Sequence, residues 1–219
     1  MADAIIYQGK ARDAIIEQLQ KAILTAAASP RPSSAFSDVV TAAATASAPL
    51  VLITESLGSK MAFDAIYKLV TSQDKNESAA GIRTFDRTTE VFMGANQMPI
   101  LALADQGLDG SQSTLANSPN YPKDALAELI AMKRLRAATV TAPPPRVVAF
   151  TDPNDALSYI LAPAKQVANY DVVDVLVSND NTYLGLLENP YPAHVGYLAN
   201  PEVMRLIACG SSDKGCVSR

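Results

Sequence analysis

Hydrophobic positions along the chain fall into two kinds of segment, short apolar runs and longer stretches with helical spacing. Four runs rich in Val, Ile and Leu predict strands, at residues 48–53, 89–94, 146–150 and 171–178. Apolar residues that recur every three or four positions predict helices at residues 11–27, 59–70, 96–105, 122–138 and 201–208. Continuous apolar strands that alternate with helices indicate an α/β fold, with a short parallel sheet of about four strands flanked by helices in one domain, residues 1–219.

Three segments fit neither pattern. Residues 71–81 are polar and predict a loop, and residues 155–168 predict no more than one or two helical turns. Residues 105–121 have no period and many turn-forming residues. Loops of that length are uncommon and often act as lids, so we consider residues 71–121 as a cap or lid region.

Composition and charge narrow the classes of function. The chain is 48% hydrophobic and 18% charged, has a net charge of −4, and its Lys and Arg residues are scattered, which argues against nucleic acid or an anionic membrane as a partner. No apolar run is long enough to span a bilayer, and no signal-peptide pattern is visible. The chain as it stands is therefore expected in the cytoplasm, or outside it if a longer precursor exists. Cys209 and Cys216 could close a small disulfide or remain free thiols.

Residues suited to acyl transfer follow three of the four predicted strands. Ser56 comes directly after the first strand, and Asp152 and Asp155 follow the third. The single histidine, His194, follows the fourth after a longer loop. The carboxyl ends of parallel strands lie at one edge of a sheet, so these side chains are expected to meet there. A serine hydroxyl needs an adjacent base, imidazole can take and return its proton near neutral pH, and a buried carboxylate can hold the imidazole in one tautomer.

These segments resemble the serine esterases and lipases of the α/β-hydrolase family. The resemblance is carried by "LITESLGSKMAFDAI", "VVAFTDPNDALSY" and "ENPYPAHVGYLANPEV", covers roughly residues 10–208, and is closest to the C-terminal half of that fold. It implies Ser56 as the nucleophile, His194 as the base and the Leu57 amide as an oxyanion donor. We expect neither a metal nor another cofactor, since one His and two Cys do not supply a zinc site.

The acid and the nucleophile turn match the family less closely. The family's acid commonly lies in a Gly-x-x-Asp pattern, and laying that pattern over "DPND" favours Asp155. Asp152 remains the alternative acid, although Asp before Pro-Asn commonly caps a turn. The family pattern Gly-x-Ser-x-Gly has Thr54 here in place of the first glycine, while Gly58 fills the second position. Small residues there are expected to let strand and helix approach each other.

The first half of the family's fold has no counterpart in this sequence. About four strands precede the nucleophile strand in that fold, whereas here one predicted helix and a loop do. No second oxyanion donor is therefore evident. The nucleophile strand is expected at or near an edge of the sheet, with residues 50–53 exposed. We expect the N-terminal helix, a missing N-terminal segment or a second subunit to cover this edge, and favour a homodimer over a monomer.

The expected function is hydrolysis of a small-molecule carboxylic ester through a Ser-His-Asp triad and an acyl-enzyme. Two alternatives stay open: a catalytically silent, hydrolase-like binding module, and an acyltransferase that uses an alcohol as acceptor. Ser56 taken alone could be a helix cap, and the Asp pair alone could be a turn. Asn96 and Gln97 follow the second strand and could contact substrate or cap a helix.

Overall fold

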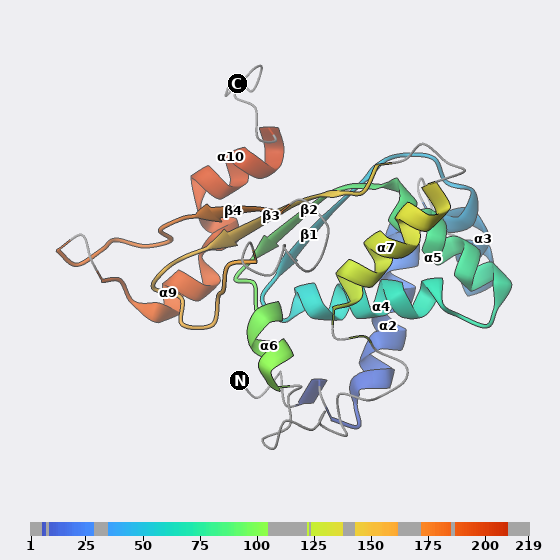
Figure 1. Cartoon of the computed structure of the whole chain (residues 1–219), viewed down its shortest axis with the longest axis horizontal. Helices are drawn as coiled ribbons and strands as arrows, with labels where there is room; N and C mark the ends of the chain where they lie inside the picture. Colours follow the sequence, from blue (N-terminus) through green and yellow to red (C-terminus); the bar gives the residue numbers. More distant parts are fainter. Residues whose placement is uncertain are drawn as a thin grey trace.

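A four-stranded, all-parallel sheet forms the centre of the molecule in a computed structural model of the chain. The structure describes residues 6–7, 9–28, 35–104, 122, 124–137, 143–161, 172–184 and 187–209. The strands lie side by side in the order β1 (Leu50–Glu55), β2 (Thr88–Gly94), β3 (Arg146–Thr151) and β4 (Val172–Leu176). The four predicted strands are all present, and the α/β class is confirmed (Figure 1).

Helices connect the strands and cover them. Their bounds are α2 (Arg12–Ala27), α3 (Phe36–Thr45), α4 (Gly58–Val70), α5 (Lys75–Arg87), α6 (Met98–Ala104), α7 (Ala125–Ala137), α9 (Pro190–Val195), the 3-10 helix η2 (Tyr197–Ala199) and α10 (Pro201–Cys209). The five predicted helices correspond to α2, α4, α6, α7 and α10. Within the described part of the chain, no helix is both long and apolar enough to cross a membrane.

Three α-helices, α3, α5 and α9, and the 3-10 helix η2 lie where the sequence pattern predicts no helix. Because α3 precedes β1, both α2 and α3 come before this strand in the described part of the chain, where the sequence predicts one helix. α5 replaces most of the loop predicted at residues 71–81. The Asp74 carboxylate begins α5 by accepting hydrogen bonds from the amides of Asn76 and Glu77, at 2.8 and 3.1 Å. The prediction of a loop was wrong because this cap and a narrow buried stripe, which includes Ala80 and Phe85, outweigh the polar composition.

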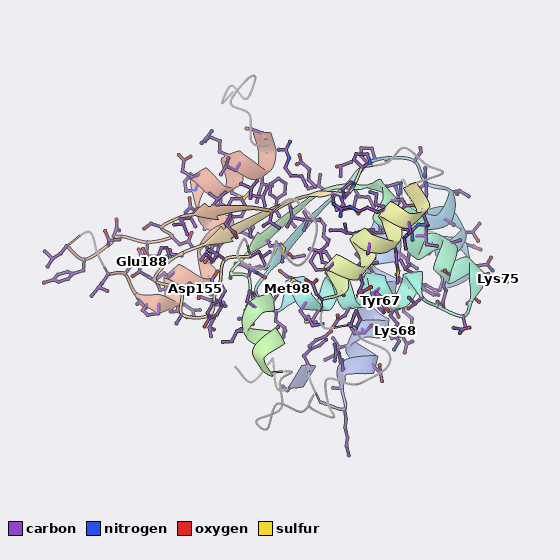
Figure 2. The ribbon with its side chains drawn as sticks, in the orientation of Figure 1. Tyr67, Lys68, Lys75, Met98, Asp155 and Glu188 are labelled. Atoms are coloured by element: carbon purple, nitrogen blue, oxygen red, sulfur yellow. The ribbon has the colours of Figure 1, made fainter. Side chains whose placement is uncertain are left out.

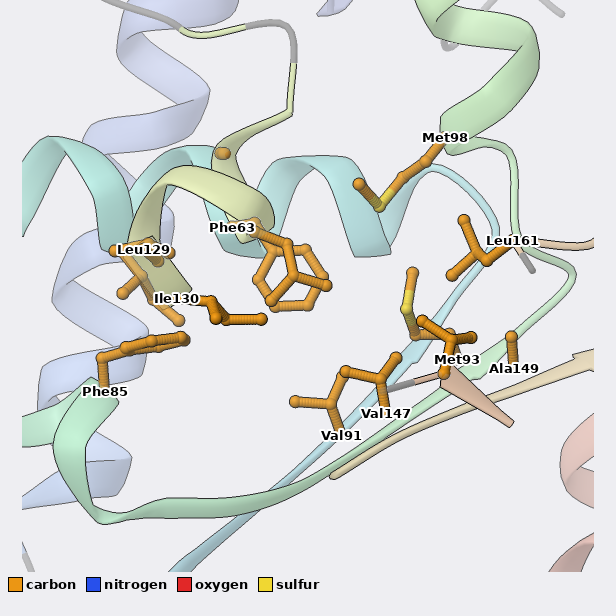
Figure 3. Close-up of a cluster of buried hydrophobic side chains, with 14 of the residues drawn as sticks. Phe63, Phe85, Val91, Met93, Met98, Leu129, Ile130, Val147, Ala149 and Leu161 are labelled. Atoms are coloured by element: carbon orange, nitrogen blue, oxygen red, sulfur yellow. The ribbon is translucent and has the colours of Figure 1, made fainter. Parts of the chain in front are cut away.

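The two faces of the sheet are covered unequally. One face packs against α4, α5 and α7, and α2 and α3 lie against α4 and α5 (Figure 1). Figure 3 shows this core, in which Phe63 of α4 lies among sheet residues such as Val91 and Val147. Burying a side chain of that size stabilises the fold by about 1.5–3 kcal/mol. The opposite face is covered by η2 and α10, which pack around Phe92 and Phe150.

β1, the strand that leads into Ser56, is an edge strand of the sheet. Val51 is 53% and Ile53 is 47% exposed, whereas Leu50 and Leu52 point to the helical side and are half-buried. The expected exposure of residues 50–53 therefore holds only for alternate positions, because neighbouring side chains of a strand point to opposite faces of the sheet. α2 packs against α4 and leaves Val51 and Ile53 exposed, so the N-terminal helix is not their cover.

Parts of three predictions fall outside the described residues. These are the segment 105–121 of the lid region, residues 162–168 of the segment expected to form one or two helical turns, and Cys216. The described part of the second segment, residues 155–161, contains turns and no helix. Cys209, the last residue of α10, is disulfide-bonded.

Candidate active site

Ser56 occupies a sharp turn between β1 and α4, at the carboxyl end of the strand. Its φ angle is 54°, in the left-handed region that is unfavourable for residues with a side chain. The Ser56 amide donates a hydrogen bond of 2.9 Å to the carbonyl of Gly94 at the end of β2, which holds the turn in place. Backbone strain of this kind costs about 1–3 kcal/mol and is concentrated at functional sites. The N-cap of α4 is Leu57, so helix capping does not account for Ser56.

The residues on either side of Ser56 hold the turn in different ways. The Thr54 hydroxyl is 2.9 Å from the Ser59 hydroxyl and donates to the Phe92 carbonyl at 3.3 Å, so this threonine ties β1 to both α4 and β2. At Gly58, a Cβ atom would meet no other atom within 4 Å. The expectation that a small residue is needed at Gly58 for strand and helix to approach was therefore wrong, because there is open space at that position.

His194 lies on α9 and faces Ser56 across the turn. α9 begins at Pro190, directly after Asn189, whose side chain accepts a hydrogen bond from the Tyr191 amide and so caps the helix. The Nε2 atom of His194 is 3.1 Å from the Ser56 hydroxyl oxygen. The His194 side chain is 22% exposed, so part of the imidazole is in contact with solvent.

Asp155 is the carboxylate that contacts His194. Both of its carboxylate oxygens lie 3.0 Å from Nδ1 of His194, and its side chain is 1% exposed. In the tautomer with its hydrogen on Nδ1, His194 donates to Asp155, and Nε2 is then an acceptor facing the Ser56 hydroxyl. Figure 2 shows Asp155 on the loop beside α9, at the same end of the molecule as Glu188.

Asp152, the alternative acid, has a different set of partners. One carboxylate oxygen accepts from the Asn154 amide at 2.9 Å, and the other accepts from the Asn179 amide at 2.8 Å. Asp152 therefore holds the turn after β3 and joins it to the loop after β4, as an Asp before Pro-Asn commonly does. Of the two candidates, it is Asp155 that lies within hydrogen-bond distance of His194.

The Leu57 amide lies at the start of α4, directly after Ser56. Among the described residues no acceptor takes its hydrogen, so it is available to an oxyanion at the helix N-terminus. The described hydrogen bonds identify no second donor for that position. Next to it, Glu55 has a buried carboxylate oxygen with no hydrogen-bond partner among the described atoms, and burial raises the pKa of this carboxyl above its usual value.

Asn96 and Gln97 lie after β2, and the Asn96 side chain is engaged with the protein. Asn96 is fully buried, accepts from the Met98 amide at 3.1 Å and donates to the Tyr159 carbonyl at 3.2 Å. The Gln97 carbonyl accepts from the Leu101 amide as the first hydrogen bond of α6. Asn96 thus caps α6, which is one of the two roles that the sequence left open, and it also joins the loop after β2 to the loop after β3.

Tyr197 completes the site, and sequence reasoning did not assign it a role there. Its side chain is fully buried, and its hydroxyl donates to Oδ2 of Asp155 at 3.1 Å. The Tyr197 hydroxyl oxygen in turn accepts a hydrogen bond from the Asp152 amide at 2.8 Å. Burial raises the pKa of Tyr197 well above its usual value, so the phenol keeps its proton. The one available signal was its position three residues after His194, at the start of η2.

Comparisons with known proteins do not identify this chain. No protein-family model, curated protein or solved structure significantly matches it. Within the described ranges, no group of three or more His, Cys, Asp or Glu side chains is arranged to hold a metal ion.

Proposed function

We propose that this protein is a serine hydrolase that cleaves carboxylic esters through an acyl-enzyme. One observation carries the proposal: Ser56, His194 and Asp155 form a continuous chain of hydrogen-bond contacts of 3.0–3.1 Å, with the serine on a strained turn. The separations fall within the range expected for a nucleophile, its base and the group that orients the base. The resemblance to α/β-hydrolase esterases and lipases supports the same chemistry and remains part of the proposal.

In the proposed reaction, Ser56 attacks the ester carbonyl while His194 takes the hydroxyl proton through Nε2. Asp155 stabilises the imidazolium through Nδ1 and does not itself take the proton. The Leu57 amide and the N-terminus of α4 stabilise the negative charge on the carbonyl oxygen. His194 then returns the proton to the leaving alcohol, which leaves an acyl group on Ser56. Water, deprotonated by His194, attacks this acyl group and releases the acid.

A catalytically silent binding module is the second candidate, and one observation favours it. The Leu57 amide is the single oxyanion donor identified in the described part of the chain. Loss of one such donor typically costs about 10²–10³ in kcat. An acyltransferase would use the same three residues and differ only in the acceptor, so an alcohol added to the assay distinguishes the two by the product formed.

Turnover of a short p-nitrophenyl ester tests the proposal. We expect wild type to release p-nitrophenol and Ser56→Ala to lose this activity. Ser59→Ala is the matched control, because Ser59 lies three residues further along, is fully buried and contacts Thr54 instead of His194. Equal turnover by wild type and Ser56→Ala would contradict the proposal, and no turnover by wild type across short esters would favour the binding module.

We further propose that the β1 edge is covered by a second copy of the chain. The support is the half-exposed pair Val51 and Ile53 on an edge strand, because exposed apolar edges favour strand pairing and hydrophobic contact. Sedimentation at micromolar concentration is expected to show a dimer that Val51→Lys dissociates. A monodisperse wild-type monomer at that concentration would exclude the homodimer.

A further inference from the structure

The triad residues, Gly94 and Tyr197 form a closed ring of contacts. The Ser56 amide donates to the Gly94 carbonyl at 2.9 Å, and Gly94 lies against the ring of Tyr197. The Tyr197 hydroxyl donates to Asp155, Asp155 contacts His194, and His194 contacts the Ser56 hydroxyl. The backbone and the side chain of the nucleophile are thus joined to the same carboxylate by two separate routes.

We propose that Tyr197 is a positioning residue of this site, which fixes the Asp155 carboxylate and moderates its charge toward His194. The inference deepens the proposed hydrolase function and rests on it. Asp155 Oδ1 accepts from the Leu157 amide at 2.9 Å, and Oδ2 accepts from the Tyr197 hydroxyl at 3.1 Å. Each oxygen therefore has a donor besides His194, and the carboxylate cannot rotate without breaking one of them.

The position of the phenol is itself held from three sides. The Asp152 amide donates to the Tyr197 oxygen, which fixes the direction in which the hydroxyl hydrogen points. The ring packs in the core between the sheet and α10, together with Phe92 and Phe150. A Cβ atom at Gly94 would come within 3.1 and 3.2 Å of Cβ and Cγ of Tyr197, so the ring lies almost directly on the backbone at the end of β2.

The charge of Asp155 decides the sign of the expected effect. A hydrogen bond to a carboxylate stabilises the charged form and draws negative charge away from the partner on its other side. Without the phenol, Asp155 would attract the imidazolium of His194 more strongly and would also be less well oriented. The Tyr197→Phe substitution leaves the other two neighbours of His194 in place. These are Ser56 and Glu55, whose carboxyl lies near enough to interact with the imidazole. Tyr197→Phe should therefore lower kcat and make His194 take up a proton at higher pH.

A second tyrosine provides a matched control. The Tyr7 hydroxyl also donates to a buried carboxylate, that of Asp64, and Tyr7 is only 2% exposed. Both Tyr→Phe variants remove one phenol-to-carboxylate hydrogen bond from the interior, so both should lower the free energy of unfolding. Asp64 does not contact the catalytic residues, so Tyr7→Phe should leave the activity of folded molecules unchanged.

The experiment compares wild type, Tyr197→Phe and Tyr7→Phe by ester kinetics and by NMR titration of the imidazole. His194 is the only histidine of the chain, so its ring signals are unambiguous and can be followed whether or not the protein is active. For Tyr197→Phe we expect roughly tenfold lower kcat with little change in KM, and an upward shift of the His194 titration midpoint. Tyr7→Phe should show neither change. Kinetics are measured below the unfolding transition and per titrated active site, so that stability does not enter.

Gly94→Ala is a second variant that keeps the phenol and displaces it. The added Cβ pushes on the Tyr197 ring, so kcat should fall in the same direction by a smaller factor. The inference is overturned if Tyr197→Phe has the kcat and the His194 titration midpoint of wild type, or changes them no more than Tyr7→Phe does. Absence of ester turnover in wild type would instead contradict the proposed function. The His194 titration would then still decide the role of Tyr197.

Discussion

Two buried aspartates, Asp155 and Asp64, have similar surroundings, but their carboxylates contact different kinds of partner. Asp155 and Asp64 each accept a hydrogen bond from a buried tyrosine, and both side chains are almost completely excluded from solvent. Asp64 lies on α4 and is further paired with Arg12 and Lys60, at 2.6 and 2.7 Å. Asp155 is instead paired with His194, which extends to Ser56.

The difference shows what distinguishes a candidate catalytic carboxylate from a structural one. Arg and Lys remain charged at neutral pH, so the partners of Asp64 hold the start of α2 against α4 and have no proton to exchange. Imidazole changes charge near neutral pH and stands between a buried carboxylate and a hydroxyl. Burial and the number of hydrogen bonds do not distinguish the two clusters. They differ in that Asp155 contacts a titratable imidazole, that of His194, which in turn contacts Ser56 on its strained turn.

Substitution of the proposed base is expected to have the largest effect on activity. His194→Ala removes the group that we propose takes the serine proton, and we expect ester turnover to fall on the order of 10⁶-fold. The free energy of unfolding should fall by about 1–3 kcal/mol, because the buried Asp155 carboxylate loses one of its hydrogen-bond partners. Initial-rate assays together with denaturant unfolding measure both quantities. Retention of wild-type turnover would exclude His194 as the base.

Asp155→Asn should have the next largest effect on turnover. An amide cannot fix the His194 tautomer as a carboxylate does, and loss of the carboxylate in such triads costs about 10⁴ in kcat. Asp152→Asn is the control, because the Asp152 carboxylate accepts backbone hydrogen bonds and its loss should mainly lower stability. If Asp152→Asn reduced kcat as much as Asp155→Asn, the assignment of the acid would be wrong.

Asp64→Asn should mainly lower stability, whereas Asp155→Asn should mainly lower turnover. Arg12 and Lys60 would be left buried beside a neutral amide, and breaking a buried ion pair in this way costs about 3–5 kcal/mol of unfolding free energy. Turnover per folded molecule should remain that of wild type. Asp13→Asn, at an exposed ion pair with Lys68, is the control and should cost no more than about 1 kcal/mol. A stable Asp64→Asn variant with impaired kcat would reverse the comparison.

The smallest expected effect is a pH-dependent gain in stability in Glu55→Gln. Burial raises the pKa of Glu55, so the folded state favours the protonated carboxyl. The protonated form therefore contributes to the free energy of unfolding below the unfolded pKa of about 4.3, and this contribution is lost as the pH rises through the folded pKa. The amide side chain of the variant is neutral throughout, so E55Q should be more stable than wild type at neutral pH and equal to it in acid.

Denaturant unfolding at several pH values checks this expectation. Glu17→Gln is the opposite control, because Lys21 lowers the pKa of Glu17 and its ionised form is the favoured one. A gain in E55Q that did not vary with pH would show that its cause is not the ionisation of Glu55.

Much of the site was predictable because it follows from strand order alone. Ser56, Asp155 and His194 each follow a parallel strand, and the carboxyl ends of such strands necessarily share one edge. The choice of Asp155 over Asp152 also agrees with the hydrogen bonds that the structure places around them.

Other features depend on tertiary contacts that the sequence does not reveal. Tyr197 contacts Asp155 because η2 packs against the sheet, and its position three residues after His194 does not by itself predict that contact. α5 was missed because its polar composition concealed a capped helix with a narrow apolar stripe. The family pattern predicted that a small residue is needed at Gly58, and this was wrong because the turn leaves open space there.

Covalent labelling by a fluorophosphonate, followed by peptide mapping, tests the central claim most directly. The reagent reacts with a serine only where a base and an oxyanion donor activate it. We expect one adduct per chain, located on Ser56, absent in Ser56→Ala and strongly slowed in His194→Ala. An unlabelled wild type, or an adduct on another residue, would contradict the claim that Ser56 is an activated nucleophile.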